Sequence, residues 1–334
     1  MIEALAPTRI DLAGGTVDIW PLYLFHPGAR TINFAVDLFA RCTIVERSDD
    51  VVVITSKDTS EVVETTLEGL EQEGRLELLV RLLKFFRPAV GLELTTDCAA
   101  PAGSGLGGSS ALNVAVCSAL NAFTLRGYSE QQLLTIAKNI ETQVIRVPAG
   151  EQDYYPAMFG GVCSIQLEIT GVTCKQLLID SALLDSRFVL CYTGKPHFSG
   201  TNNWEIFKKY IDGDSEIRAH FTRIVDISLR MEQAVCSADI DAMAKLLDEE
   251  WQVRKKLASG VTTPMIERLV EVARASGALG AKVCGAGGGG CVVFIAAEGR
   301  KAELTAALLK AGGEVLDCRL QPKGVQVTSR AACE

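Results

Sequence analysis

Histidine is scarce in this sequence, and cysteine never occurs in a metal-binding spacing. Only three of the 334 residues are histidines, and none lies next to a cysteine cluster or an obvious nucleophile. The eleven cysteines are scattered and nowhere form C-x-x-C. The sequence therefore indicates neither a zinc site, nor a disulfide framework, nor a Ser-His-Asp triad. We expect reduced, mostly buried thiols in a cytoplasmic protein.

A long apolar run and a basic stripe are also absent. The longest apolar stretches, such as Cys291 to Ala297, fall far short of the roughly 20 residues of a membrane helix. Glu3 and Pro7 interrupt the N-terminus before any apolar segment develops, so we expect no signal peptide. Lys and Arg number 33 against 41 Asp and Glu, a net charge of −8. This acidic balance argues against nucleic-acid and membrane partners.

The remaining composition is that of a large globular protein. Hydrophobic residues make up 48% and charged residues 22% of the chain, which is close to the average. At roughly 150 residues per domain, the length predicts about two domains. Strands and helices mingle without regular βαβ alternation, which predicts an α+β fold. We expect one domain over residues 1–185 and a second over residues 186–334.

Hydrophobic periodicity predicts the main elements. Strands are expected at Thr31–Val36, Arg41–Arg47, Val51–Ser56, Gly91–Thr95, Arg187–Thr193 and Cys291–Ala296. Helices are expected at Leu76–Phe86, Ala111–Leu125, a segment after Ser129, residues 216–236, 239–257 and 264–276, and Lys301–Ala311. Two helix starts carry explicit signals, because Ser129 with Gln132 forms a capping box and Thr263 precedes Pro264.

A glycine-rich loop precedes the most apolar helix. The segment PAGSGLGGSSA, from Pro101 to Ala111, contains four glycines and three serines within eight residues. Glycines let the backbone approach a ligand closely, and a helix start offers free N–H groups and a positive dipole end to an anion. Ser109 and Ser110 could cap the helix, touch a phosphate or ligate Mg²⁺. We expect a phosphate-binding loop in preference to a plain turn with a cap.

Two well-known phosphate loops do not fit this segment. Its spacing Gly103-x-Gly105-x-x-Gly108 formally matches a dinucleotide fingerprint, but Pro101 interrupts the approach and the following helix leads to another helix. The lysine that a Walker A loop requires is missing.

A second glycine loop, CGAGGGGC, runs from Cys284 to Cys291 and is followed by a strand. It is either a tight turn against the core or a backbone that approaches something closely. We expect both glycine loops to flank one ligand in a cleft between the domains.

Three acidic side chains are candidates for chemistry. Asp153, in VPAGEQDYYPAMFGG, could accept a proton from a substrate hydroxyl, although its neighbour Glu151 could do the same. Glu141 lies beside the buried stripe of its helix and could reach Mg²⁺. Its alternative is an exposed charge paired with Lys138 or Arg146.

Arg9 and Asp18 bracket the segment LAGGT, where a short strand is expected to open into a turn. Each could be an ordinary surface charge. An aspartate is also well suited to accept hydrogen bonds from vicinal hydroxyls.

Taken together, these segments resemble the GHMP kinase family, named for galactokinase, homoserine, mevalonate and phosphomevalonate kinases. Three motifs match in the family's order: APTRIDLAGGTVDI from Ala6, PAGSGLGGSSA from Pro101 and KVCGAGGGGC from Lys282. They span nearly the whole chain, and the trio is highly specific. The resemblance implies an N-terminal domain like ribosomal protein S5 domain 2 and a ferredoxin-like C-terminal domain.

By position, the resemblance implies that Asp153 is the catalytic aspartate, Glu141 the metal-binding glutamate and Arg9 the basic residue near the attacking hydroxyl. ATP and Mg²⁺ are implied as cofactors. The residues implied to bind ATP are Pro101, Gly103, Ser104, Gly105, Leu106, Gly107, Gly108, Ser109 and Ser110. The family loop usually reads GLGSSA or GLSSSA, whereas this one reads GLGGSSA. Of its two serines, Ser109 is expected on the metal side.

Within the family, LAGGTVD and GEQDYYPAMFGG are similar to segments of heptose-phosphate and fucose kinases. CYTGKPHFSGTNNW, from Cys191, falls where those kinases have a Tyr-Thr-Gly segment lining the sugar pocket. The substrate-binding residues implied are Gly15, Thr16, Asp18, Tyr154, Thr193, Gly194, Gly287 and Gly288. Lys195, His197 and Arg30 are the nearby cations that could bind a second phosphate.

The reaction implied is ATP-dependent phosphorylation of a sugar hydroxyl, with the anomeric C1 hydroxyl of a heptose phosphate or related sugar as the expected acceptor. The partners are then small molecules, namely the sugar and ATP. Two alternatives are a family kinase acting on a non-sugar alcohol such as mevalonate or homoserine, and a sensor of the same fold that binds sugar or nucleotide without turnover.

Overall fold

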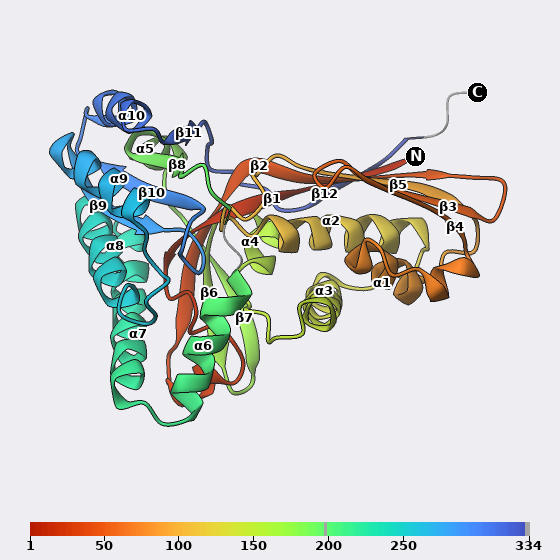
Figure 1. Cartoon of the computed structure of the whole chain (residues 1–334), viewed down its shortest axis with the longest axis horizontal. Helices are drawn as coiled ribbons and strands as arrows, with labels where there is room; N and C mark the ends of the chain where they lie inside the picture. Colours follow the sequence, from red (N-terminus) through yellow and green to blue (C-terminus); the bar gives the residue numbers. More distant parts are fainter. Residues whose placement is uncertain (197–198, 331–334) are drawn as a thin grey trace.

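The computed structural model describes residues 1–196 and 199–330 and contains two β-sheets with helices packed against them (Figure 1). The α+β class expected from the sequence is confirmed. No helix within the described ranges is long and apolar enough to cross a membrane.

The first sheet has eight strands. They are β1 (Ile2–Ala13), β2 (Arg30–Glu46), β3 (Val51–Ser56), β4 (Glu61–Thr66), β5 (Leu92–Cys98), β6 (Val162–Glu168), β7 (Gly171–Leu177) and β12 (Gln326–Ser329). The order is β12-β1-β2-β5-β3-β4, and β6 pairs with both β2 and β7. Only the β3–β5 pairing is parallel among the pairs of this sheet within the described residues.

The long strand β2 corrects the expectation of two separate strands at 31–36 and 41–47. Its C-terminal part pairs with β5 and its N-terminal part pairs with β6, so one continuous strand serves two neighbours. The register between β1 and β2 shifts between Pro7 and Thr8. A proline in a paired strand is tolerated at such an irregularity, because no ladder hydrogen bond from its nitrogen is needed there.

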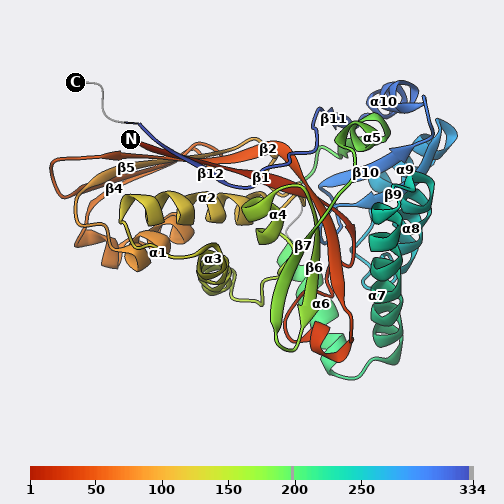
Figure 2. The same cartoon turned by 180° about the vertical axis from the view of Figure 1, so that it is seen from behind.

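One face of the first sheet is covered by helices, as Figures 1 and 2 show from opposite sides. These are α1 (Glu77–Phe86), α2 (Gly108–Phe123), α3 (Glu130–Ile145) and α4 (Tyr154–Phe159), with 3₁₀ turns at Leu22–Phe25 and Gly69–Gln72. Helix α2 starts three residues before the expected Ala111, directly after Gly107 with its φ of 70°. The capping box of α3 is confirmed, with Ser129 and Gln132 bonded reciprocally.

The second sheet has four antiparallel strands in the order β11-β8-β10-β9. They are β8 (Phe188–Tyr192), β9 (Ala278–Val283), β10 (Cys291–Ala296) and β11 (Glu314–Leu316). Its helices, together with the one that leads into it, are α5 (Ser181–Arg187), α6 (Ser199–Ile211), α7 (Ser215–Cys236), α8 (Ile240–Arg254), α9 (Pro264–Ala275) and α10 (Lys301–Lys310). With its helical connections, this strand order is the ferredoxin-like arrangement that the resemblance implies.

The domain boundary that we propose at residue 185 falls within α5, between the last strand of the first sheet before it and the first strand of the second sheet. Strand β12 then carries the chain back to the first sheet, where it pairs with β1 (Figure 2).

A buried cluster of four charged side chains joins the two parts. Asp11 comes from β1, Lys282 from β9, and Glu250 and Arg254 from α8; each is at most 2% exposed. The Lys282 Nζ lies 2.9 Å from Asp11 Oδ1 and 2.8 Å from Glu250 Oε1. Arg254 Nη1 lies 3.5 Å from Asp11 Oδ2 and 3.6 Å from Glu250 Oε1. Burial alone would raise the pKa of Asp11, but Lys282 and Arg254 hold that pKa below its ordinary value.

We predict that Lys282→Met destabilises the protein by about 3–5 kcal/mol, because two buried carboxylates would then share one cation. Urea unfolding of the variant and the wild type measures the difference. The control is Arg41→Met, which breaks the exposed Arg41–Glu3 pair and should cost less than about 1 kcal/mol. Equal losses in the two variants would contradict the role given to the cluster.

Candidate active site

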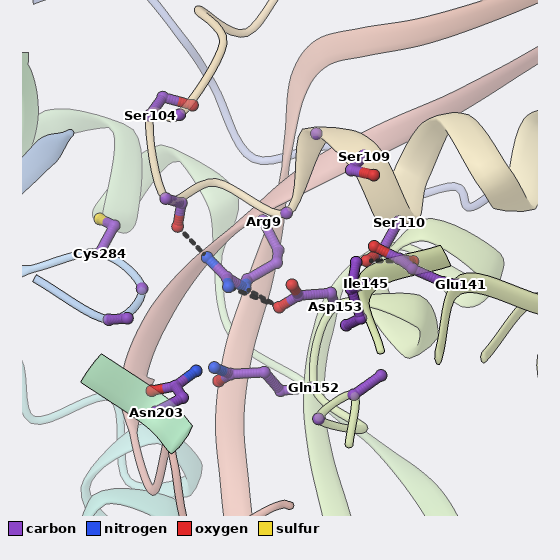
Figure 3. A pocket seen from close by; sticks show the side chains of 18 of the residues that line it. Arg9, Ser104, Ser109, Ser110, Glu141, Ile145, Gln152, Asp153, Asn203 and Cys284 are labelled. Atoms are coloured by element: carbon purple, nitrogen blue, oxygen red, sulfur yellow. Dashed lines mark hydrogen bonds and ion pairs between the residues drawn. The ribbon is translucent and has the colours of Figure 1, made fainter. Parts of the chain in front are cut away.

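A cavity of about 360 Å³ lies where the two parts meet. Its wall includes the turn after β1, the glycine loop before α2, the segment before α4, the loop between β9 and β10, and residues of β1, α3, α6 and α8 (Figure 3). The sequence-predicted residues that line it are Arg9, Thr16, Asp18, Pro101, Gly103, Ser104, Gly105, Gly107, Gly108, Ser109, Ser110, Glu141, Asp153, Tyr154 and Gly287.

The two glycine loops pack backbone against backbone. The Cys291 amide donates to the Ser104 carbonyl at 2.7 Å. A Cβ atom at Gly105 would lie 2.2 Å from the Cys284 carbonyl oxygen, and one at Gly290 would lie 2.6 Å from the Ser104 carbonyl oxygen. Any side chain at these two positions would separate the loops, so the glycines are needed for this contact. Of the two interpretations of the second loop, a close backbone approach is correct, and its partner is the first loop.

Arg9 ties the first glycine loop to Asp153. Its Nε donates to Asp153 Oδ1 at 2.9 Å and its Nη1 donates to the Gly105 carbonyl at 2.5 Å (Figure 3). Burial would lower the pKa of Arg9, but the carboxylates of Asp153 and Asp11 outweigh burial and raise it. The Asp153 side chain is 29% exposed, in contrast to 3% for Arg9. The guanidinium is therefore a fixed support, and the carboxylate is accessible from the cavity.

Glu151 does not share this position. Its Oε1 accepts from Lys138 Nζ at 2.5 Å, its side chain is 5% exposed, and it does not line the cavity. Burial raises its pKa in spite of Lys138. Of the two acids that the sequence left open, Asp153 is the one that faces the cavity.

Glu141 is buried and reaches the cavity from α3. It accepts hydrogen bonds from the Tyr154 hydroxyl at 2.7 Å and from Ser110 Oγ at 3.0 Å, and burial raises its pKa. The interpretation of Glu141 as an exposed partner of Lys138 or Arg146 is therefore wrong.

Oxygen donors surround this end of the cavity, and such a set suits Mg²⁺. Ser110 is engaged with Glu141, whereas Ser109 is exposed in the cavity wall beside it. Within the described residues, no three His, Cys, Asp or Glu side chains converge on one point. A magnesium ion here would therefore depend on phosphate oxygens for much of its coordination.

Asp18 is buried in the same cavity wall as Asp153. Its Oδ2 accepts from the Gln152 amide at 2.9 Å. Burial, together with nearby Asp153 and Asp11, raises the pKa of Asp18 to about 6. A Cβ atom at Gly150 would lie 2.4 Å from Asp18 Oδ2, so the chain passes directly over this carboxyl group. Asp18 is thus a cavity-wall carboxyl that changes charge in mildly acidic solution.

Five predicted site residues do not line the cavity: Gly15, Leu106, Thr193, Gly194 and Gly288. The Leu106 side chain lies in the core. The Thr193 amide donates to the Gly290 carbonyl at 3.0 Å, and the Gly288 amide donates to the Val261 carbonyl at 2.8 Å. Thr193 and Val261 therefore hold the second glycine loop through its backbone, and Gly288 is one of the loop residues held in this way.

Two of the three predicted phosphate-binding cations, Arg30 and Lys195, do not line the cavity. Arg30 forms an ion pair with Glu232 on α7 and lies outside the cavity wall, so its assignment was wrong. Lys195 has an exposed side chain outside the wall, and its carbonyl accepts from the Gly290 amide at 2.9 Å. His197 lies outside the described residues.

Among the residues of the cavity wall that sequence reasoning missed are Gln152, Asn203 and Arg254. Arg254 Nη2 donates to Thr16 Oγ1 at 2.9 Å and to the Gly285 carbonyl at 2.8 Å. Adjacency to Asp153 was the only signal for Gln152. Arg254 comes from α8 and belongs to no local motif. Asn203 lies in α6, within the segment CYTGKPHFSGTNNW that the resemblance implied near the sugar pocket, but the residue itself was not singled out.

Comparison with known proteins identifies the family to which this chain belongs. The model of the GHMP kinases N terminal domain matches residues 77–161, and that of the GHMP kinases C terminal matches residues 231–314. A D-glycero-alpha-D-manno-heptose 7-phosphate kinase from Campylobacter jejuni is 30% identical over 97% of this chain and 98% of its own length. The chain belongs to the GHMP kinase family. It is therefore an ATP-dependent phosphotransferase that acts on an alcohol group.

Other GHMP kinases are similar over the same extent of chain. An L-fucokinase/L-fucose-1-P guanylyltransferase from Bacteroides fragilis is 26% identical over 97% of this chain and 38% of its own length. The solved structure of a D-glycero-D-manno-heptose 1-phosphate kinase from Bacteroides thetaiotaomicron superposes with a TM-score of 0.81 at 25% identity, covering 99% of this chain and 100% of that one. The expected α+β GHMP kinase fold is confirmed.

We predict that Asp18→Asn stabilises this GHMP kinase at pH 8. The carboxyl pKa is near 6 in the fold against an ordinary 3.8, so ionising the buried group costs stability that is intact below the ordinary value and lost as the pH rises through 6. The melting temperature should rise by roughly 5 °C at pH 8, and the gain should shrink towards pH 4. Thermal unfolding across this range, with the exposed Asp97→Asn as control, measures it. A gain independent of pH would contradict the burial of a charged Asp18.

Proposed function

We propose that this GHMP kinase transfers the γ-phosphoryl group of ATP to the anomeric C1 hydroxyl of a heptose phosphate or a related sugar. The observation that carries the proposal is the position of Asp153, whose carboxyl group lines the cavity beside Arg9 and Gly107 of the first glycine loop (Figure 3). A hydroxyl held beside Asp18 would have a base and the end of the nucleotide within reach. The full-length similarity to the Campylobacter jejuni heptose 7-phosphate kinase supports the choice of acceptor.

The nucleotide end is proposed to lie along residues 103–110. Backbone amides of this loop and the start of α2 would bind phosphate oxygens, because these N–H groups have no helical partner and the helix dipole favours negative charge. Glu141 and Ser109 would hold Mg²⁺ beside them, which fits the oxygen donors present. When bound, Mg²⁺ neutralises part of the charge on the transferred phosphoryl group.

Asp153 is proposed to accept the proton of the attacking hydroxyl. Arg9 holds the carboxylate through Nε and contacts the loop through Nη1, so the base and the phosphate loop are positioned by one side chain. The same guanidinium would stabilise the charge that develops on the attacking oxygen. Positioning and charge neutralisation are the main tasks in phosphoryl transfer, and this arrangement supplies both.

The choice of metal ligand gives a matched pair of variants. Ser109→Ala should weaken Mg²⁺-dependent ATP binding about tenfold or more, because a ligand would be lost, whereas Ser110→Ala should mainly lower stability by removing a hydrogen bond to Glu141. Calorimetric titration with ATP at several Mg²⁺ concentrations, together with melting curves, separates the two effects. A stronger loss of Mg²⁺ dependence in Ser110→Ala would reverse the assignment.

An acceptor panel tests the reaction itself. ADP release is measured with heptose 7-phosphate, free hexoses, fucose, galactose, mevalonate and homoserine, and the highest kcat/KM is expected for the sugar phosphate. Asp153→Asn should lower kcat by roughly 10²–10⁴-fold with ATP affinity nearly unchanged, since general bases contribute that much. Preference for mevalonate or homoserine would reject the sugar assignment. Activity of Asp153→Asn within about threefold of the wild type would reject Asp153 as the base.

A further inference from the structure

Gln152 presents a fixed amide group to the cavity immediately beside Asp153. The residue is 7% exposed, and its main-chain amide is held by Asp18 Oδ2 at 2.9 Å. Its side chain lies against the turn after β1, because a Cβ atom at Gly15 would be 3.0 Å from Gln152 Nε2. The main chain of Gln152 is thereby held beside Asp18, and its side-chain amide packs against the turn after β1.

Asn203 presents a second amide from the opposite wall. It belongs to α6, in the second part of the chain, and lines the same cavity. Figure 3 shows the Gln152 and Asn203 side chains pointing toward each other, on the side of Asp153 that is away from Ser109 and Glu141. The two amides therefore flank the end of the cavity opposite the proposed nucleotide and magnesium site.

Both amides carry a buried oxygen that lacks a hydrogen-bond partner within the described residues: Oε1 of Gln152 and Oδ1 of Asn203. Buried polar atoms are nearly always paired, and one left unpaired costs roughly 1–3 kcal/mol. A ligand that donates hydrogen bonds to these atoms removes that cost on binding. Two such atoms at one end of one cavity indicate a ligand with at least two donor groups.

The chemistry of the unpaired atoms selects the ligand group. Amide oxygens accept hydrogen bonds, so they require O–H or N–H donors, whereas a phosphate dianion or a carboxylate offers none. The cations of the described cavity wall, Arg9 and Arg254, are already paired with Asp153 and with Asp11 and Glu250, so no unpaired cation of this wall attracts an anion. Neutral hydroxyl groups satisfy both conditions.

We propose that Gln152 and Asn203 form an amide clamp that binds two ring hydroxyls of the acceptor and determines specificity for polyhydroxylated substrates. The proposal rests on the function proposed above and deepens it. It orients the acceptor, because any phosphate that the sugar already carries must point away from the clamp. It also discriminates against acceptors of the mevalonate and homoserine type, which lack the set of ring hydroxyls that the clamp binds.

The test uses Gln152→Met and Asn203→Leu, which remove the amides at similar volume, and Gln143→Met on the exposed side of α3 as the matched control. Each clamp variant should raise the acceptor KM about tenfold, as expected for one lost hydrogen bond to a buried group. The KM for ATP should stay within twofold, and the control should match the wild type. Acceptor KM values that do not change, or KM values for ATP that rise equally, would overturn the clamp.

Monodeoxy analogues of the preferred acceptor give an independent measurement. The wild type should discriminate against at least two of them, and each clamp variant should lose the discrimination against one. Unchanged discrimination in both variants would reject the clamp even if their folding were impaired. If the preferred acceptor proves not to be a sugar, the proposed function fails, and the clamp is still judged on the KM and hydroxyl contacts of that acceptor.

Discussion

The buried group of Asp11, Glu250, Arg254 and Lys282 is the constraint on which the site depends. These two acids and two bases are buried at the junction, where water cannot solvate them, and they neutralise one another. Each charge is therefore tolerated only if the other three are in place. Two of these four side chains also contact the loops that line the cavity. Glu250 Oε2 accepts from the Gly14 amide at 2.9 Å, and Arg254 contacts Thr16 and the Gly285 carbonyl. The turn after β1 and the second glycine loop are thereby set relative to each other.

From this junction the cavity is built by close backbone contacts. The two glycine loops meet without side chains between them, and Arg9 extends from β1 to hold both the Gly105 carbonyl and Asp153. The amides proposed to bind phosphate, the proposed base Asp153 and the buried Asp18 are consequently assembled by segments far apart in sequence. Little flexibility is left in their relative positions, which is what phosphoryl transfer by positioning requires.

Local features were predictable because their signals are local. The capping box at Ser129 and the helix start at Thr263–Pro264 were predicted correctly. Each depends only on groups within four residues of one another in the sequence. The glycine loops indicated that the backbone approaches another group closely. The sequence did not indicate that the two loops would contact each other. Continuous pairing along β2 was missed because it depends on two partner strands distant in sequence. Arg254 was missed for the same reason, because tertiary contacts alone give it a place in the cavity wall. Asn203 lies in a segment that the resemblance marked, but nothing local distinguished it from its neighbours.

The most direct test of the account is the identity of the product. The purified protein is incubated with ATP, Mg²⁺ and D-glycero-D-manno-heptose 7-phosphate, and the product is examined by ³¹P NMR. The account predicts a second phosphate resonance coupled to the anomeric proton, with loss of the reducing end. A new phosphate on any other hydroxyl, or no new phosphate while mevalonate or homoserine is phosphorylated, would contradict it.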